Sequence, residues 1–360
     1  MNTRNYTFIL LASGFILFNS TCHHQAENKE IIPSIQHLIT DTVCRYQYVE
    51  KGTTFLKNGH IFLIDPRNAG VMYIWDVETG QKDWFVLGDH TDYPESLVQQ
   101  LPFSFYQFDW RLRSYFAFSF ENNQVKFKRV RFQFSDPIID RVVQIGENKY
   151  VTLGKQSKLL GLYDNKSKEM AYFGHYPLPV NIPVDQNTRE NIVRSFEGAI
   201  AYSDSHSMVV YGSFNYAYLS CYRYSGGKLK FQWEKFILPP PSFELVNGYI
   251  EEKDTDTEGR VSSVVTAGDY IFAGYRQRDK KDSKLDAKHS ILVYDMKGNH
   301  LATLHTDCPV SIFAVDLDEQ TIYGISSSAL IDDAIYLSSN KDELAALWPH
   351  IVRFRFDASW

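Results

Sequence analysis

One local pattern occurs six times along this chain: an apolar run ends in an aromatic residue, a polar residue follows, and turn-forming residues come next. The polar residues are Asp76, Glu121, Asp164, Ser225, Asp295 and Asp357, at steps of 45, 43, 61, 70 and 62 residues. A repeat of this length indicates an array of small units, each of which buries its apolar faces only against its neighbours. We therefore predict an all-β fold, a six-bladed β-propeller of four-stranded antiparallel blades.

Composition agrees with strands rather than helices. Aromatic residues make up 15% of the chain and stand in short alternating runs between Gly, Asn and Asp. The first blade is predicted at residues 53–56, 60–65, 71–76 and 83–87, and the fifth at 261–266, 270–275, 290–295 and 300–305. Pro239, Pro240 and Pro241 are expected to stiffen the crossing from the fourth blade to the fifth.

The sixth repeat is followed almost at once by Trp360, so no fourth strand remains for the last blade. The β-like run at residues 43–49 is the one unassigned candidate for that strand. We expect it to close the ring from the N-terminal side, which would protect a sheet edge. Residues 41–360 would then form one propeller domain.

The N-terminus has the pattern of a secretory signal peptide over residues 1–21. Arg4 provides the positive charge, and residues 8–18 form an apolar run that is too short to span a bilayer. Cys22 follows the small residues Ser20 and Thr21, an arrangement that resembles the lipobox of bacterial lipoproteins. We predict lipid attachment at Cys22; the alternative is an ordinary signal peptide followed by an incidental cysteine.

Residues 22–40 are expected to be a lipidated, flexible tether because most of this segment is polar and lacks a hydrophobic period. Acidic residues near Cys22 are few, namely Glu27 and Glu30. The expected location is therefore the outer membrane, lipid-anchored and facing the periplasm, with the cell surface as the alternative.

The second half of the chain, Asn191–Ser326, resembles the TolB-like six-bladed propeller lipoproteins of gut-type Gram-negative bacteria. The segments that carry the resemblance are residues 196–201, 207–211, 259–263, 269–275 and 291–299. Members of that family are mostly uncharacterised. The resemblance implies a propeller in the cell envelope and names no catalytic residue.

Three arginines are the candidate ligand-binding residues. Arg67, Arg260 and Arg276 each stand at the end of a predicted strand, where propeller loops surround the channel, and a guanidinium group suits a carboxylate or carbonyl of a sugar. Tyr216 is a fourth candidate, which could stack on a sugar ring or pack in the core. Arg276 also opens a charged run, residues 276–289, interpreted as a solvated insertion between two strands; the alternative is a basic loop that binds an acidic glycan or partner.

The repeated carboxylates have two interpretations. Asp76, Asp164 and Asp295 could form a ring around a cation, but Asp before a turn more often accepts backbone N–H bonds of its own hairpin. Asp316 and Asp318 could bind calcium, although their surroundings read as strand followed by turn. The histidines of Asp89-His90 and His175-Tyr176 lack a nucleophile or metal-ligand pattern. We therefore assign no catalytic residue, metal or cofactor.

Three cysteines remain after Cys22. Closure of the ring would bring Cys44 near the sixth blade, which begins just after Cys308, so a Cys44–Cys308 disulfide is one possibility. Disulfide geometry tolerates little separation, which weighs against it. Cys221 alternates with aromatic residues within a strand and is predicted to be a buried thiol.

Two functional hypotheses follow. The formal charge is −6, with no basic stripe, so nucleic acid is not an expected partner. The favoured hypothesis is a monomeric, non-catalytic propeller that binds a glycan, a peptide or a protein. The alternative is an enzyme of the propeller channel, either a metal-dependent lactonase or a glycan hydrolase or lyase.

Overall fold

Strands account for all the regular elements in the described part of the computed structural model. The described residues all belong to the unit formed by residues 32–360. They are residues 33–39, 41–45, 53–57, 60–64, 71–76, 79, 82–86, 98–101, 104–109, 114–121, 124–133, 138–155, 157–177, 195–239, 242–246, 249–253, 256–282, 287–326 and 350–360. Between residues 41 and 129 the description is confined to the backbone, apart from Asp76 and Thr79.

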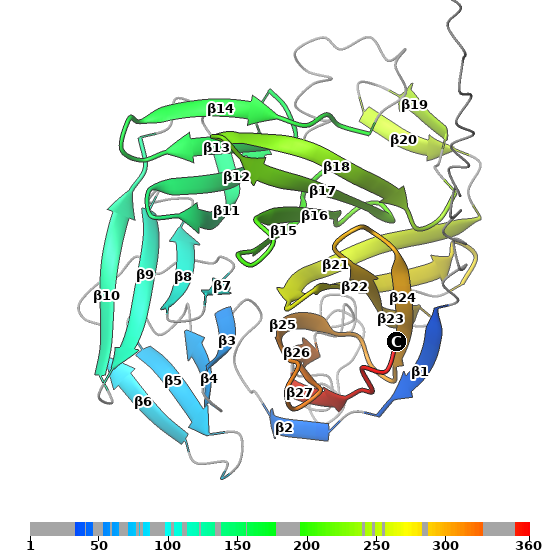
Figure 1. The fold of residues 1–360 in the computed structure, drawn as a ribbon. Coiled ribbons are helices and arrows are strands. Elements are labelled where there is room, and N and C mark those ends of the chain that lie inside the picture. Colours follow the sequence, from blue (N-terminus) through cyan, green and yellow to red (C-terminus); the bar gives the residue numbers. More distant parts are fainter. Residues whose placement is uncertain are drawn as a thin grey trace, which may run out of the picture. The chain divides into compact units, whose positions relative to one another are not determined.

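Two four-stranded antiparallel sheets come from the first third of the chain (Figure 1). One contains β3 (Thr53–Lys57), β4 (His60–Ile64), β5 (Val71–Asp76) and β6 (Lys82–Val86). The other contains β7 (Val98–Leu101), β8 (Ser104–Asp109), β9 (Ser114–Glu121) and β10 (Gln124–Arg131). In both, strands that are consecutive in sequence are neighbours in the sheet, as in a meander.

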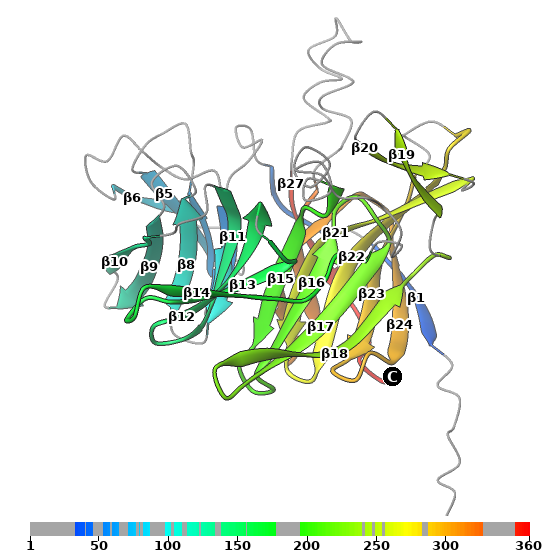
Figure 2. The ribbon, with the colours of Figure 1, turned by 90° about the horizontal axis from the view of Figure 1, so that it is seen from above.

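Two further meanders follow in the middle of the chain. The first contains β11 (Ile138–Gly146), β12 (Lys149–Lys155), β13 (Leu160–Asp164) and β14 (Glu169–Phe173). The second contains β15 (Gly198–Ser203), β16 (Met208–Ser213), β17 (Tyr218–Ser225) and β18 (Lys228–Phe236). A separate two-stranded hairpin, β19 (Ser242–Val246) and β20 (Tyr249–Lys253), comes next (Figure 2).

The last two sheets each combine strands from both ends of the chain. One is a meander of β21 (Thr257–Ala267), β22 (Tyr270–Asp279), β23 (Lys288–Asp295) and β24 (His300–Thr306), to which β1 (Ser34–Leu38) adds a fifth strand. The other contains β25 (Ser311–Asp316), β26 (Thr321–Ser326) and β27 (His350–Arg355), with β2 (Asp41–Arg45) as its fourth strand.

Most of the first strands of these sheets contact the first strand of the next sheet. β3 contacts β7, β11 contacts β15, β15 contacts β21, β21 contacts β25, and β25 contacts β3. The small antiparallel sheets are therefore arranged as in a β-propeller, which confirms the predicted all-β propeller arrangement. The strands predicted at residues 53–87 and 261–305 are present with ends within four residues of the expected ones, whereas the sequence did not indicate the hairpin β19–β20.

Both faces of the strand β16 are buried. Val209 and Tyr211 of β16 pack toward the sheet β11–β14, while Met208 and Val210 pack toward the sheet β21–β24. Successive side chains of a strand point to opposite faces, so a strand between two neighbouring sheets needs apolar residues at every position. This explains the apolar run from Met208 to Tyr211 in β16, a strand whose six residues are all buried.

The fourth strand of the last sheet comes from the N-terminal side, as predicted. β2 pairs with β27 in the antiparallel sense, with Asp41 opposite Arg353 and Arg45 opposite His350. The strand lies at residues 41–45 rather than 43–49. The sequence could indicate it because β27 otherwise has a free edge.

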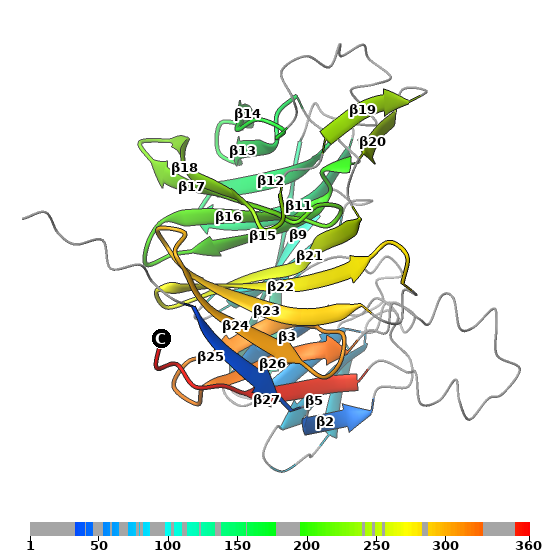
Figure 3. The same cartoon turned by 90° about the vertical axis from the view of Figure 1, so that its right-hand side faces the viewer.

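The expectation of a tether does not hold for residues 34–38, which form β1 and pair with β24 in the parallel sense (Figure 3). The side chain of Gln36 fastens this strand: its Nε2 donates to the carbonyl of Asp357 over 2.7 Å, and its Oε1 accepts from the Asp357 N–H over 2.9 Å. Leu38 is buried against the core shared by β21–β24 and β25–β27. The segment around residues 34–38 is mostly polar, so the local sequence pattern did not predict these long-range contacts.

Candidate functional site

Two of the predicted ligand-binding arginines lie directly opposite each other. Arg260 near the start of β21 pairs with Arg276 near the end of β22. Cross-strand partners project to the same face of a sheet, so the two guanidinium groups share one surface. The side chain of Arg260 is 49% exposed. The structure thus brings together two residues that are 16 positions apart in the sequence.

A second cross-strand pair adjoins the first. Glu258 lies opposite Arg278, and the Arg278 Nη2 atom donates to the Glu258 Oε2 atom over 2.8 Å. The Arg260 Nη2 atom lies 3.7 Å from the same carboxylate oxygen. The Glu258 carboxylate therefore interacts with both Arg278 and Arg260.

The third strand of the sheet adds a histidine to this surface, because His289 of β23 pairs with Arg276. Burial, followed by the proximity of Arg276, lowers the pKa of His289 to about 4, so the ring is neutral at pH 7. Burial, together with Arg260 and Arg278, also lowers the pKa of Arg276, although the guanidinium stays charged. We name Glu258, Arg260, Arg276, Arg278 and His289 the arginine cluster.

The arginine cluster extends beyond the predicted residues. The insertion predicted at residues 276–289 is shorter in the structure, because residues 276–279 belong to β22 and residues 288–289 belong to β23. The spacing of Glu258 and Arg260, and of Arg276 and Arg278, is the alternation of a strand, and this signal could have revealed Glu258 and Arg278. A surface with several guanidinium groups suits a planar anion such as a carboxylate.

The other predicted contact residues are placed differently. Tyr216 is 6% exposed and packs against Phe196 with ring centroids 5.0 Å apart, so it is a core residue rather than a stacking platform. Arg67 and Cys22 lie outside the described residues. Within the described part of the chain, no helix is long and apolar enough to cross a membrane.

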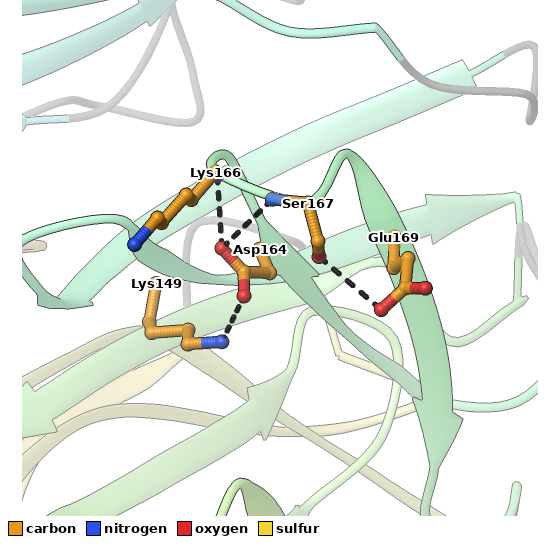
Figure 4. A network of polar contacts seen from close by, with 5 residues as sticks. All are labelled: Lys149, Asp164, Lys166, Ser167 and Glu169. Atoms are coloured by element: carbon orange, nitrogen blue, oxygen red, sulfur yellow. Dashed lines mark hydrogen bonds and ion pairs between the residues drawn. The ribbon is translucent and has the colours of Figure 1, made fainter.

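The repeated aspartates cap their own turns, and Figure 4 shows the contacts of Asp164. The Asp164 Oδ1 atom accepts from the N–H groups of Lys166, at 2.9 Å, and Ser167, at 3.5 Å, while Oδ2 receives a bond from Lys149. The bond from Lys149 and the backbone bonds lower the pKa of Asp164 to about 2. Asp295 similarly accepts the N–H groups of residues 297 and 299, and Asp76 accepts that of residue 79. The turn-capping interpretation is confirmed for these three carboxylates.

Asp316 has the same role, since its Oδ1 accepts the N–H of Glu319 over 3.0 Å. Among the described residues, no group of three His, Cys, Asp or Glu side chains could hold a metal ion. Asp89 and His90 lie outside the described residues. His175 is described, and its Nε2 lies 3.4 Å from Glu234 Oε2, a contact that the sequence did not suggest.

The cysteine predictions have different outcomes. Cys221 is a buried thiol, as predicted, and burial raises its pKa to about 12. Cys308 is partly buried beside the core of the last two sheets. The side chain of Cys44 lies outside the described residues, so the Cys44–Cys308 disulfide stays a prediction.

No family model matches the sequence, and no curated protein matches it. Solved structures do resemble the fold. A luciferin-regenerating enzyme is 11% identical with a TM-score of 0.51, covering 89% of this chain and 96% of its own. Regucalcin from Agrobacterium tumefaciens, a calcium-binding protein, is 9% identical with a TM-score of 0.50 and coverages of 89% and 95%. A DUF4221 family member from Bacteroides vulgatus is 11% identical with a TM-score of 0.51 and coverages of 89% and 96%. These likenesses concern the fold alone.

Proposed function

We propose that this chain is a cell-envelope lipoprotein whose propeller binds an acidic glycan, without catalysis, through the arginine cluster. In this proposal the four-stranded and five-stranded sheets are six blades, related to the TolB-like propellers and closed by β2. Cys22 carries the lipid, and the outer membrane, on its periplasmic side, is the location. The observation that carries the ligand class is the direct pairing of Arg260 with Arg276.

Like charges directly opposite each other destabilise a sheet. An anion between the two guanidinium groups would convert this repulsion into two charge-assisted hydrogen-bonding interactions, each contributing about 1.5–3 kcal/mol. Glu258 lies at one side of the pair and fixes Arg278 in place. Arg260 has an exposed side chain that can reach a ligand without unfolding the strand.

The chemistry of arginine favours a carboxylate over a neutral group. Guanidinium is planar and charged at all physiological pH values, and it binds a carboxylate with two parallel N–H···O bonds. The neutral state of His289 at pH 7 leaves its ring able to accept or donate a bond beside Arg276. Uronic acids combine a carboxylate with hydroxyl groups and therefore match both kinds of partner.

Isothermal titration calorimetry of the mature protein tests the ligand class. The probes are tetragalacturonate, an alginate tetramer and a hyaluronan hexamer, at low and at moderate salt. We expect at least one of them to bind, and Arg260→Ala to weaken that binding by tenfold or more, whereas Arg260→Lys loses less. Arg223→Ala is the matched control, because Arg223 is an exposed arginine of β17, on another sheet. Equal affinity of Arg260→Ala and the wild type would overturn the assignment.

The anchor and the alternative function need separate measurements. Radiolabelled palmitate should enter the full chain in bacterial cells and should not enter the Cys22→Ser variant. Metal analysis combined with turnover assays on lactones and oligosaccharides addresses the enzyme hypothesis. A stoichiometric divalent ion together with turnover would replace the binding proposal by that alternative.

A further inference from the structure

A second polar surface lies where the sheets β11–β14 and β15–β18 meet at their last strands. β14 contacts β18 there, and both strands can be followed in Figure 3. His175 follows the end of β14, while Phe231 and Glu234 belong to β18. We name these three residues the β14–β18 site.

A β-bulge brings Phe231 and Glu234 to one face. They are three positions apart, and in a regular strand residues at an odd separation point to opposite faces. In β18, however, Phe231 pairs with Tyr222 while Trp233 pairs with Cys221, so Gln232 is an extra residue. Because of the bulge, Glu234 pairs with Ser220, two positions from Tyr222 on β17, so Glu234 and Phe231 lie on the same face. Bulges commonly re-aim side chains at binding sites.

A chain of hydrogen bonds orients the carboxylate. The Tyr218 hydroxyl donates to Glu234 Oε2 over 2.6 Å, and His175 Nε2 lies 3.4 Å from the same oxygen. Tyr218 is fully buried, and burial followed by the Glu234 carboxylate raises its pKa, so the hydroxyl remains a donor. The side chains of His175 and Glu234 are 60% and 35% exposed, respectively. Both side chains therefore have exposed surface that a ligand can reach.

An aromatic surface adjoins these polar groups. Phe231 is 49% exposed and is one of three large apolar side chains that are exposed among the described residues. Its ring meets Tyr222 edge to face at 5.7 Å and lies 6.0 Å from the His175 ring. Gly174 lets the chain pass close to Tyr222, because a Cβ atom at position 174 would lie 2.7 Å from the Tyr222 hydroxyl. The φ of Gly174 is +76°, a conformation that favours glycine.

Two buried hydroxyls lie on the same face of β17. Ser220 Oγ and Tyr222 Oη are both inaccessible to solvent, and neither makes a hydrogen bond of good geometry to a described residue. The Ser220 hydroxyl is nevertheless close enough to Tyr222 to offset part of the rise in pKa that burial causes there. Ser220 is the cross-strand partner of Glu234, and Tyr222 is that of Phe231. A buried hydroxyl without a good hydrogen bond costs about 1–3 kcal/mol, so native structures contain few of them.

We propose that the β14–β18 site binds a neutral saccharide. A sugar ring presents an apolar face to Phe231 and hydroxyl groups to Glu234 and His175. A hydroxyl both donates and accepts, which matches a carboxylate acceptor beside an imidazole. An amine or another cation would match the carboxylate alone and would compete with His175 for it. The site belongs to a different sheet from the arginine cluster, so this proposal does not depend on the acidic-glycan proposal.

Calorimetry with neutral hexasaccharides tests the inference, with maltohexaose, cellohexaose and mannohexaose as the probes. We expect the mature protein to bind at least one of them, and Phe231→Ala and Glu234→Gln each to weaken that binding by tenfold or more. Phe231→Trp offers a larger stacking surface and should bind at least as tightly as the wild type. Because Phe231 is half exposed, these variants should keep the wild-type melting temperature within a few degrees.

Two control variants distinguish binding at this site from binding elsewhere on the protein. Lys230→Ala changes an exposed residue of the same strand whose side chain points to the other face, and should leave the affinity unchanged. Arg260→Ala should also leave it unchanged. Failure of all three hexasaccharides to bind, or undiminished binding by the folded Phe231→Ala and Glu234→Gln variants, would overturn the inference. Loss of binding in Arg260→Ala would assign it to the arginine cluster instead.

Discussion

The packing between two sheets can be tested at one glycine. Gly212 of β16 faces β21, and a Cβ atom at this position would lie 2.6 Å from Val261 Cγ1 and 2.7 Å from Val264 Cγ2. Carbon atoms prefer about 3.5–4.0 Å, so Gly212→Ala must push the two sheets apart or move both valines. Overpacking of this kind costs about 1–3 kcal/mol. Each kcal/mol lowers the melting temperature by about 2–4 °C in a domain of 150–250 residues, and by less in this larger one.

Equilibrium unfolding in urea measures the effect, and Gly146→Ala is the matched control. A Cβ atom at Gly146 would meet nothing closer than Lys149 Cβ, at an ordinary 3.7 Å. Removing a glycine where space permits stabilises a protein by about 0.4–1 kcal/mol, because it lowers the entropy of the unfolded chain. We expect Gly146→Ala to equal or exceed the wild type and Gly212→Ala to fall below it. A Gly212→Ala protein as stable as Gly146→Ala would refute the close packing of β16 on β21.

Three further predictions follow from single residues. The pKa of His289 is lowered from 6.5 to about 4, so the unfolded chain binds this proton first and stability should fall as pH drops from about 6.5 to 4; His289→Asn should flatten that part of a pH–stability curve. Cys221 is buried and its pKa is raised to about 12, so peptide mass spectrometry should find it unmodified by iodoacetamide in the native protein and modified in urea. Gln36→Ala removes both bonds to Asp357 and should cost about 1 kcal/mol, with faster hydrogen exchange over residues 34–38; unchanged exchange would contradict the role of this clamp.

The sequence predicted the sheets well where apolar residues alternate with polar ones and turn-forming residues separate the strands. Asp295 precedes a turn with Gly298, whose φ is +85°, so apolar alternation and turn chemistry agree at this hairpin. The strand β2 could be predicted because the C-terminal part of the sequence provides only three strands for the last sheet. In these places local preference and long-range pairing point to the same structure.

Features that depend on distant contacts could not be predicted. The parallel pairing of β1 with β24 leaves no trace in the local pattern of residues 34–38, whose Ile35 is 68% exposed. The bulge at Gln232 changes the direction of Glu234, and periodicity places that side chain on the wrong face. Arg260 and Arg276 were both selected from the sequence, but their direct opposition depends on the register of β21 and β22.

The way β1 is attached determines how the fold responds to mechanical load. A pull on the chain ahead of Ser34 reaches β1 before any other described strand. A force along the strand would shear the β1–β24 ladder as a whole, whereas a force across it would open the hydrogen bonds one at a time. The Gln36 clamp on Asp357 would share that load with the C-terminal residues. Tension on the chain ahead of Ser34 would therefore act first on the contacts that join β1 to β24 and to Asp357.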